Sequence, residues 1–125
     1  MSKKSLSKLL TEVELEVMNI LWSLEGGTVR DVLASLSKER NLAYTSVSTM
    51  LRILEQKKII KSSKEGKAHI YSPILLKHEY EGTTLNHMVN HVFEGAPSNL
   101  VKCLVSDKNL SDSEREQIKS ILAEL

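Results

Sequence analysis

Apolar residues recur along the first half of the chain with the spacing of three short amphipathic helices. They return every three to four residues, the period at which side chains share one face of an α-helix. The three apolar stripes are Val13, Val17, Ile20, Leu21 and Leu24; Val29, Val32, Leu33 and Leu36; and Val47, Met50, Leu51 and Leu54. Because only a brief turn separates the second and third stripes, the pattern predicts a helix-turn-helix core.

Polar residues mark the expected ends of these helices. Thr11 and Thr28 each stand three residues before an acidic side chain, which is the pattern of a capping box at a helix start. The glycine pair at 26–27 is expected to end the first helix. We expect the second helix to end near Asn41 and the third to run over about 44–57.

The helical period breaks after the third stripe. Residues 58–63 and 68–71 have the composition and short alternation of two strands, and the turn between them, 64–67, offers Gly66 for a positive φ. Pro73 closes this unit. Three helices followed by a two-stranded hairpin predict a mainly α fold in which the hairpin is the wing of a winged helix-turn-helix domain over residues 1–73.

From residue 74 the pattern is helical again and predicts three amphipathic helices, with Ser98 and Ser111 as caps of the last two. Fewer than about 50 residues rarely form a stable core alone. We therefore expect 74–125 to be a helical dimerisation domain that pairs with a second copy of the chain; packing of these helices on 1–73 of the same chain is the alternative. The residues expected at the dimer interface are Leu85, Val89, Val92, Phe93, Leu100, Leu104, Ile118, Ile121 and Leu122.

The polar face of the third helix has an unusual composition. A solvated helix face is rich in Glu and Lys, whereas this one offers short hydroxyl side chains and a single arginine, which allow close approach to a duplex and contact with phosphate or guanine. The residues predicted to lie near DNA on this helix are Thr45, Ser46, Ser48, Thr49 and Arg52. For Thr45 and Ser46, capping of the helix start is the alternative interpretation.

Positive charge is concentrated in the same region, although the formal net charge is only +1. Residues 38–67 hold eight basic and three acidic side chains. Such a concentration suits a phosphate backbone. Lys64 and Lys67, expected at the tip of the wing, are predicted to contact phosphate or the minor groove.

Composition narrows the class of protein. Charged residues make up 26% of the chain and apolar ones 41%, as in ordinary folded proteins, and no apolar run reaches the length needed to span a bilayer. We expect a cytoplasmic protein without membrane insertion, without a cofactor and without an enzymatic constellation. The single cysteine, Cys103, excludes an internal disulfide framework and is expected to be a small buried side chain.

His87 and His91 stand four residues apart on a predicted helix, the spacing of a metal-binding pair. No carboxylate or second cysteine completes a ligand set in the sequence. A histidine pair at a helix surface or interface is therefore the prediction, and a metal-responsive regulator using both residues is an alternative.

Several segments resemble the penicillinase-repressor family (BlaI and MecI, with the copper repressor CopY as a relative). They are the first-helix segment 10–22, the second-helix start 28–32, the helix segment 44–54, the wing segment 66–73, and the tail segments 98–101 and 110–111. The resemblance implies a homodimeric repressor that covers a palindromic DNA operator and blocks transcription. A winged helix that docks on protein instead of DNA is the other alternative.

The resemblance also carries expectations about release from DNA. In the β-lactam branch of the family a membrane sensor and protease system causes cleavage in the tail, at an Asn-Phe bond that aligns here with Cys103 and Leu104. The copper branch uses a Cys-x-Cys pair, which this sequence lacks. Ser48 and Ile53 stand where the family pattern has basic residues, so a different operator sequence is expected.

Overall fold

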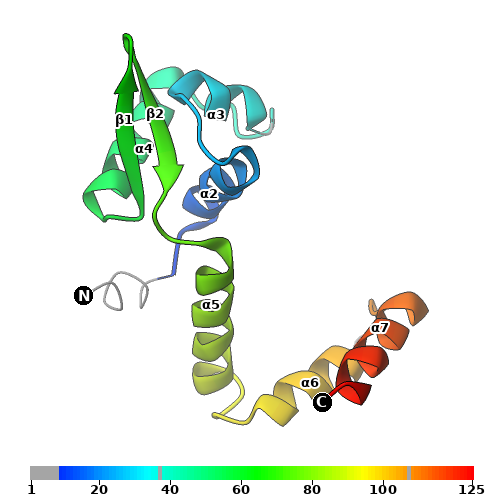
Figure 1. Ribbon diagram of the computed structural model, residues 1–125. Coiled ribbons are helices and arrows are strands. Elements are labelled where there is room, and N and C mark those ends of the chain that lie inside the picture. Colours follow the sequence, from blue (N-terminus) through cyan, green and yellow to red (C-terminus); the bar gives the residue numbers. More distant parts are fainter. Residues whose placement is uncertain (1–8, 37, 107) are drawn as a thin grey trace. The chain divides into compact units, whose positions relative to one another are not determined.

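The computed structural model describes residues 9–36, 38–106 and 108–125, and the contacts within it divide the chain into two compact units that meet at Thr84 and Leu85. The first unit contains the helices and the hairpin of a winged helix (Figure 1). The described elements are α2 (Glu12–Leu24), α3 (Val29–Ser35), α4 (Tyr44–Gln56), β1 (Ile60–Glu65), β2 (Ala68–Pro73), α5 (Lys77–His91), α6 (Pro97–Ser106) and α7 (Asp112–Ala123).

Both predicted capping boxes of the first unit are present. Thr11 and Glu14 exchange hydrogen bonds with each other's backbone at the start of α2, and Thr28 and Asp31 do the same at α3. Each box satisfies two backbone N–H groups that a helix start leaves without a partner. The predicted starts of the first two helices are therefore confirmed.

The apolar stripes meet in one core, with two differences from the prediction. Met18, not Leu24, completes the buried face of α2, and Leu24 is exposed. Every buried side chain of α3 and α4 belongs to the predicted stripes, although Leu33 and Met50 of those stripes are only half-buried. The core is completed from the hairpin, its flanking residues and α5 by Ile59, Ile60, Tyr71, Leu75 and Tyr80. Helix α3 is shorter than predicted, because its backbone leaves the helical region at Leu36, while Asn41 takes the positive φ of a turn residue.

The wing is a two-stranded antiparallel hairpin in which Ile60 pairs with Pro73 and Glu65 with Ala68. Gly66 has a φ of 62°, as the turn prediction required. Gly27 forms two further backbone hydrogen bonds with Tyr71, of 2.9 and 2.8 Å, which fix the end of α2 to β2. The base of the wing is thereby fixed to the helical core.

The second unit contains the C-terminal part of α5 together with α6 and α7 (Figure 1). Its second helix begins at Pro97, a residue well suited to a first helical position, so Ser98 lies inside α6 and is not its cap. Ser111 accepts a hydrogen bond from the backbone N–H of Glu114 and caps α7 as expected. Within the described chain, none of the helices combines the length and apolar character that crossing a bilayer requires.

Candidate nucleic-acid interface

Helix α4 presents a continuous polar face to solvent. Thr45, Ser46, Thr49 and Arg52 are exposed on it, and Ser48 is half-buried. The helix begins after Ala43, whose side chain makes no capping hydrogen bond. The interpretation of Thr45 and Ser46 as capping residues is therefore wrong, and the first turn keeps backbone N–H groups of the kind that bind phosphate.

The opposite face of α4 holds the helix in place. Val47, Leu51 and Leu54 are fully buried, and the carboxylate of Glu55 accepts a hydrogen bond of 2.6 Å from the hydroxyl of Ser62 on β1. The helix is thus fixed both to the core and to the wing. A rigid support of this kind gives exposed side chains a defined position against a ligand.

Two of the basic residues counted in the sequence serve the fold instead of the interface. Arg40 donates to Glu16 across 2.7 Å, and Lys57 lies 3.1 Å from the carboxylate of Glu14, so both are paired with acidic side chains of α2. The hydrogen bond to Glu16 raises the pKa of Arg40 above its usual value. The sequence interpretation, which pooled all eight basic residues of 38–67, needs correction on this point.

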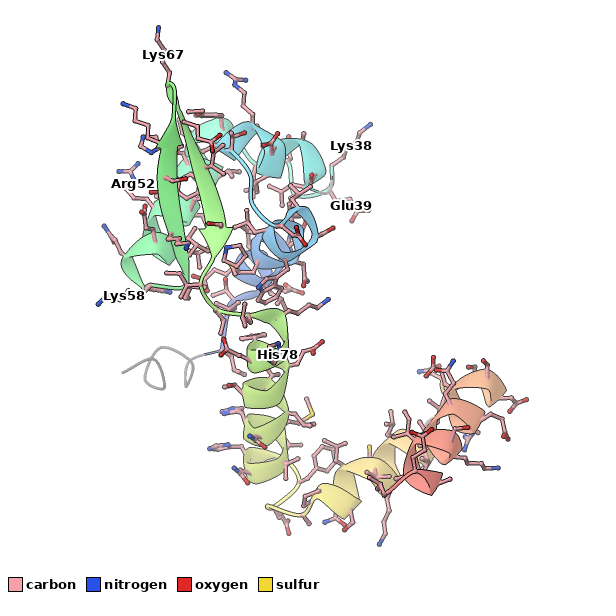
Figure 2. The ribbon with its side chains drawn as sticks, viewed as in Figure 1. Lys38, Glu39, Arg52, Lys58, Lys67 and His78 are labelled. Carbon is pink, nitrogen blue, oxygen red and sulfur yellow. The ribbon has the colours of Figure 1, made fainter. Side chains whose placement is uncertain are left out.

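The other basic residues divide between two sides of the first unit. Figure 2 shows Lys38 and Glu39 on one side, and Arg52 and Lys58 on the other, while Lys67 projects from the tip of the hairpin. Lys64 lies in β1 opposite His69, one step back from the tip where it was expected. Ion pairs within the described residues leave out five cationic side chains between the start of α4 and the tip of the hairpin, namely Arg52, Lys58, Lys61, Lys64 and Lys67.

A groove separates the beginnings of α3 and α4 from the wing. The polar residues that line it are Thr28, Arg30, Tyr44, Ser48, Lys67, His69 and Tyr71. The guanidinium of Arg30 lies over the ring of Tyr44, 5.3 Å from its centroid, which holds a cation at the groove wall. Arg30 and Lys67 give this concave surface beside α4 its positive charge, and His69 lies next to them.

The sequence interpretation missed Arg30, Tyr44 and His69. Arg30 lay outside the basic segment that was counted, and Tyr44 was treated only as a helix start. For His69 the sequence offers only the short alternation over 68–71, which predicts a strand and indicates no contact with DNA. The three residues come together because α3, α4 and the wing pack against one another, and local sequence spacing does not reveal such packing.

The exposed apolar residues of the second unit bear on the dimerisation prediction. Val92 is 66% exposed, Ile121 62% and Leu122 52%, and Leu85 and Leu104 are also exposed, whereas Val89 is buried and Phe93, Leu100 and Ile118 are half-buried. Cys103 is exposed on α6, so the expectation that it is buried is wrong for the single chain. The described residues contain no cluster of three or more metal-ligating side chains.

Comparison with known proteins identifies the family to which the chain belongs. Residues 10–124 match the profile of the penicillinase repressor family. The chain belongs to the penicillinase repressor family. The resemblance seen in the helix and wing segments is therefore confirmed, and with it the mainly α winged-helix fold.

Relatives within the family cover nearly the whole chain. The penicillinase repressor of Bacillus licheniformis is 26% identical over 115 residues, which cover 92% of this chain and 90% of that protein. The methicillin resistance regulatory protein MecI of Mammaliicoccus sciuri is 25% identical over 113 residues, with 90% and 92% covered.

Solved structures match somewhat more than half of the chain. The DNA-binding domain of the repressor BlaI aligns with a TM-score of 0.51 and 30% identity over 57% of this chain and 87% of its own. The monomeric form of Bacillus licheniformis BlaI in complex with the blaP half-operator aligns with a TM-score of 0.50 and 29% identity, covering 58% of this chain and 89% of its own.

Proposed function

We propose that this protein is a transcriptional repressor that binds operator DNA through α4 and the β1–β2 wing. The observation that carries the proposal is the exposed face of α4, where short hydroxyl side chains and one arginine stand on a helix fixed from behind. The matching BlaI structure, a monomer bound to a half-operator, supports one winged helix per half-site. Such a repressor acts on chromosomal DNA in the cytoplasm.

In this proposal α4 is the recognition helix in the major groove. Thr45, Ser46, Ser48 and Thr49 are short enough to bring the helix close to base edges and phosphates, and Arg52 reaches guanine or a phosphate. Ser48 is the most constrained of them, because it lies half-buried at the groove wall. Its hydroxyl can act there as a donor or an acceptor.

The wing and the groove take the sugar-phosphate backbone. Lys67 supplies positive charge at the wing side of the groove, and Lys64 adds a second cation on β1, opposite His69. A strand of the duplex that runs between recognition helix and wing would pass Arg30, which Tyr44 holds at the groove wall. Phosphate contacts of this kind position a protein on DNA without reading its sequence.

Repression is proposed to need two copies of the chain. The exposed apolar side chains of the second unit, Val92, Ile121 and Leu122 among them, are the surface that a partner copy would cover. Two winged helices joined in this way bind a palindromic site with the gain in effective concentration that linkage provides. The homodimer then blocks transcription by occupying the operator.

Release from DNA is proposed to follow from weakening of that dimer, in answer to a membrane sensor and protease system. The bond between Cys103 and Leu104 lies within α6. A protease would therefore reach it only when this helix opens, because cleavage requires an extended backbone. Cleavage at this bond stays a prediction.

A matched pair of arginine variants tests the DNA-binding proposal. An operator duplex is selected from random double-stranded DNA with the full chain, and affinity is measured by fluorescence anisotropy. Arg52→Ala should weaken binding about tenfold or more, the effect of losing one good base or phosphate contact. Arg40→Ala, which removes a cation paired with Glu16, should leave affinity within about twofold once folding is verified.

The salt dependence of the same measurement separates DNA binding from docking on a protein. Each phosphate contact contributes a slope of about 0.9 in log affinity against log salt. Lys67→Ala should reduce the measured slope by about one such unit. Failure to select any duplex, or equal affinity in Arg52→Ala and the parent protein, would refute the proposed recognition helix.

A further inference from the structure

Two histidines near the end of α5 form a stacked pair. The ring centroids of His87 and His91 are 4.2 Å apart, and their planes are inclined by 22°. Both side chains are exposed and belong to the second unit, whereas the surface proposed to bind DNA belongs to the first. The sequence shows only their spacing of four residues; the structure adds that the rings already lie face to face.

A backbone hydrogen bond fixes the protonation of one ring. Nδ1 of His91 lies 2.9 Å from the carbonyl oxygen of His87. A carbonyl can only accept, so Nδ1 of His91 carries the hydrogen, and in the neutral ring the lone pair is on Nε2. Histidines that bind metal ions almost always donate their second ring N–H in this way, because the bond orients the ring and raises the basicity of the ligating nitrogen.

We propose that His87 and His91 together bind one divalent transition-metal ion of the class that favours imidazole, namely Cu²⁺, Ni²⁺ or Zn²⁺. Bonds of about 2.0–2.1 Å at a tetrahedral angle place two ligating nitrogens about 3.4 Å apart. Because the lone pair of an imidazole lies in the plane of the ring, the two stacked rings must turn out of the stack before one nitrogen of each can reach a shared ion. Both side chains are exposed and four residues apart on α5, so rotation about their side-chain bonds is sufficient for this.

The chemistry of the pair defines the kind of site. Among the described residues no third His, Cys, Asp or Glu joins it, so water fills the other positions in a single chain. The site is therefore an open and exchangeable one, not a closed structural centre. Two neutral nitrogen ligands without a carboxylate exclude Mg²⁺ and Ca²⁺, which take oxygen ligands.

Isothermal titration of the untagged, full-length protein with copper, nickel and zinc salts tests the proposal. We expect one ion per chain, with Cu²⁺ bound more tightly than Ni²⁺ or Zn²⁺, the order that nitrogen sites generally follow. His87→Gln and His91→Gln should each weaken binding about tenfold or more. Both side chains are exposed, so neither substitution disturbs the core.

His78, in the first turn of the same helix, provides the matched control (Figure 2). His78→Gln should bind each metal as the parent does. No uptake at about 100 μM metal, binding retained in the doubly substituted His87→Gln/His91→Gln protein, or equal loss in His78→Gln would each overturn the proposal.

Discussion

The indole N–H of Trp22 donates a hydrogen bond of 2.9 Å to the carbonyl oxygen of Leu75, a residue 53 positions further along the chain. The ring of Tyr80 lies 6.1 Å from that of Trp22, and its hydroxyl oxygen accepts from the backbone N–H of Leu10 across 3.0 Å. These contacts fix the start of α5 to α2. The part of α5 up to Thr84 is thus held by the first unit.

Replacement of the indole should measure how much this connection stabilises the first unit. Trp22→Phe keeps an aromatic ring and leaves the carbonyl of Leu75 without its donor. Loss of a partly buried hydrogen bond partner costs about 1–3 kcal/mol. Urea unfolding should show this decrease, while anisotropy should show unchanged DNA affinity below the unfolding transition. An unchanged midpoint would mean that water replaces the indole without cost.

The pH dependence of stability should contain a contribution from Glu14. Burial acts to raise the pKa of this carboxyl, but the hydrogen bonds from Thr11 and the ammonium of Lys57 outweigh it, and the pKa is lowered from 4.5. A lowered pKa in the folded state means that the carboxylate stabilises the fold above the unfolded-state value and that this stabilisation is lost as the pH falls through the folded-state pKa.

Glu14→Gln isolates this contribution, because glutamine keeps the capping-box geometry but does not titrate. The parent should be more stable than the variant at pH 7, by about 1 kcal/mol at most, since the side chain of Lys57 is half exposed. The difference should shrink towards zero as the pH is lowered through the folded-state pKa of Glu14, which lies below that of an unperturbed glutamate. Urea midpoints measured at both ends of this range decide the matter; a constant difference would contradict the assignment.

The same carboxylate shows what the sequence could and could not reveal. Its hydrogen bonds with Thr11 are local, so the capping box was readable from a spacing of three residues. Its ion pair with Lys57 joins residues 43 positions apart, and no local pattern indicates that Lys57 is paired and does not belong to the basic surface. The position of Arg30 at the candidate interface is likewise invisible to local pattern, because its contact with Tyr44 joins two different helices.

Local pattern also failed where tertiary packing set the boundary. The apolar stripe of α3 continues to Leu36, and the prediction extended the helix a turn further, whereas the chain turns at Leu36 to bury that side chain. The exposure of Cys103 follows from the small size of the second unit, which buries few of its apolar positions within one chain. The proposed partner surface and the predicted division between residues 73 and 74 both concern pairing with a second copy of the chain, and both stay predictions.

Gly26 is expected to resist substitution. Its φ of 138° lies in the region that favours glycine, and an added Cβ would stand 3.2 Å from the carbonyl oxygen of Tyr71. Gly26→Ala should destabilise the first unit by about 1–3 kcal/mol through backbone strain. Gly82→Ala, within α5 and facing open space, should instead be neutral or stabilising by up to about 1 kcal/mol. Thermal unfolding that ranks the two variants in the opposite order would contradict the strain argument.

Arg30→Ala should reveal whether DNA occupies the groove between α3, α4 and the wing. If Arg30 contacts a phosphate, its removal should weaken binding to selected and unselected duplexes equally and reduce the salt slope by about one phosphate contact. Arg52→Ala should instead weaken the selected duplex more. Anisotropy titrations with both duplexes at several salt concentrations distinguish the two roles. Unchanged affinity in Arg30→Ala would mean that DNA does not contact Arg30 in the groove, and the proposal for α4 would be unaffected.

The dimerisation proposal is best tested at a residue that the single chain leaves exposed. Val89 is buried within one chain, so a charge there would unfold α5 and dimer alike, whereas Val92 is 66% exposed. Val92→Asp should split the dimer, because burying a carboxylate in an apolar interface is energetically costly. Its affinity for a palindromic operator should fall by about two orders of magnitude. Binding to a half-site should be unchanged.

Sedimentation velocity and anisotropy with both duplexes test this, with Asn90→Asp as the control for added charge on an exposed neighbour. A Val92→Asp protein that still sediments as a dimer would place the interface elsewhere, and a parent that sediments as a monomer at all concentrations would remove the need for one.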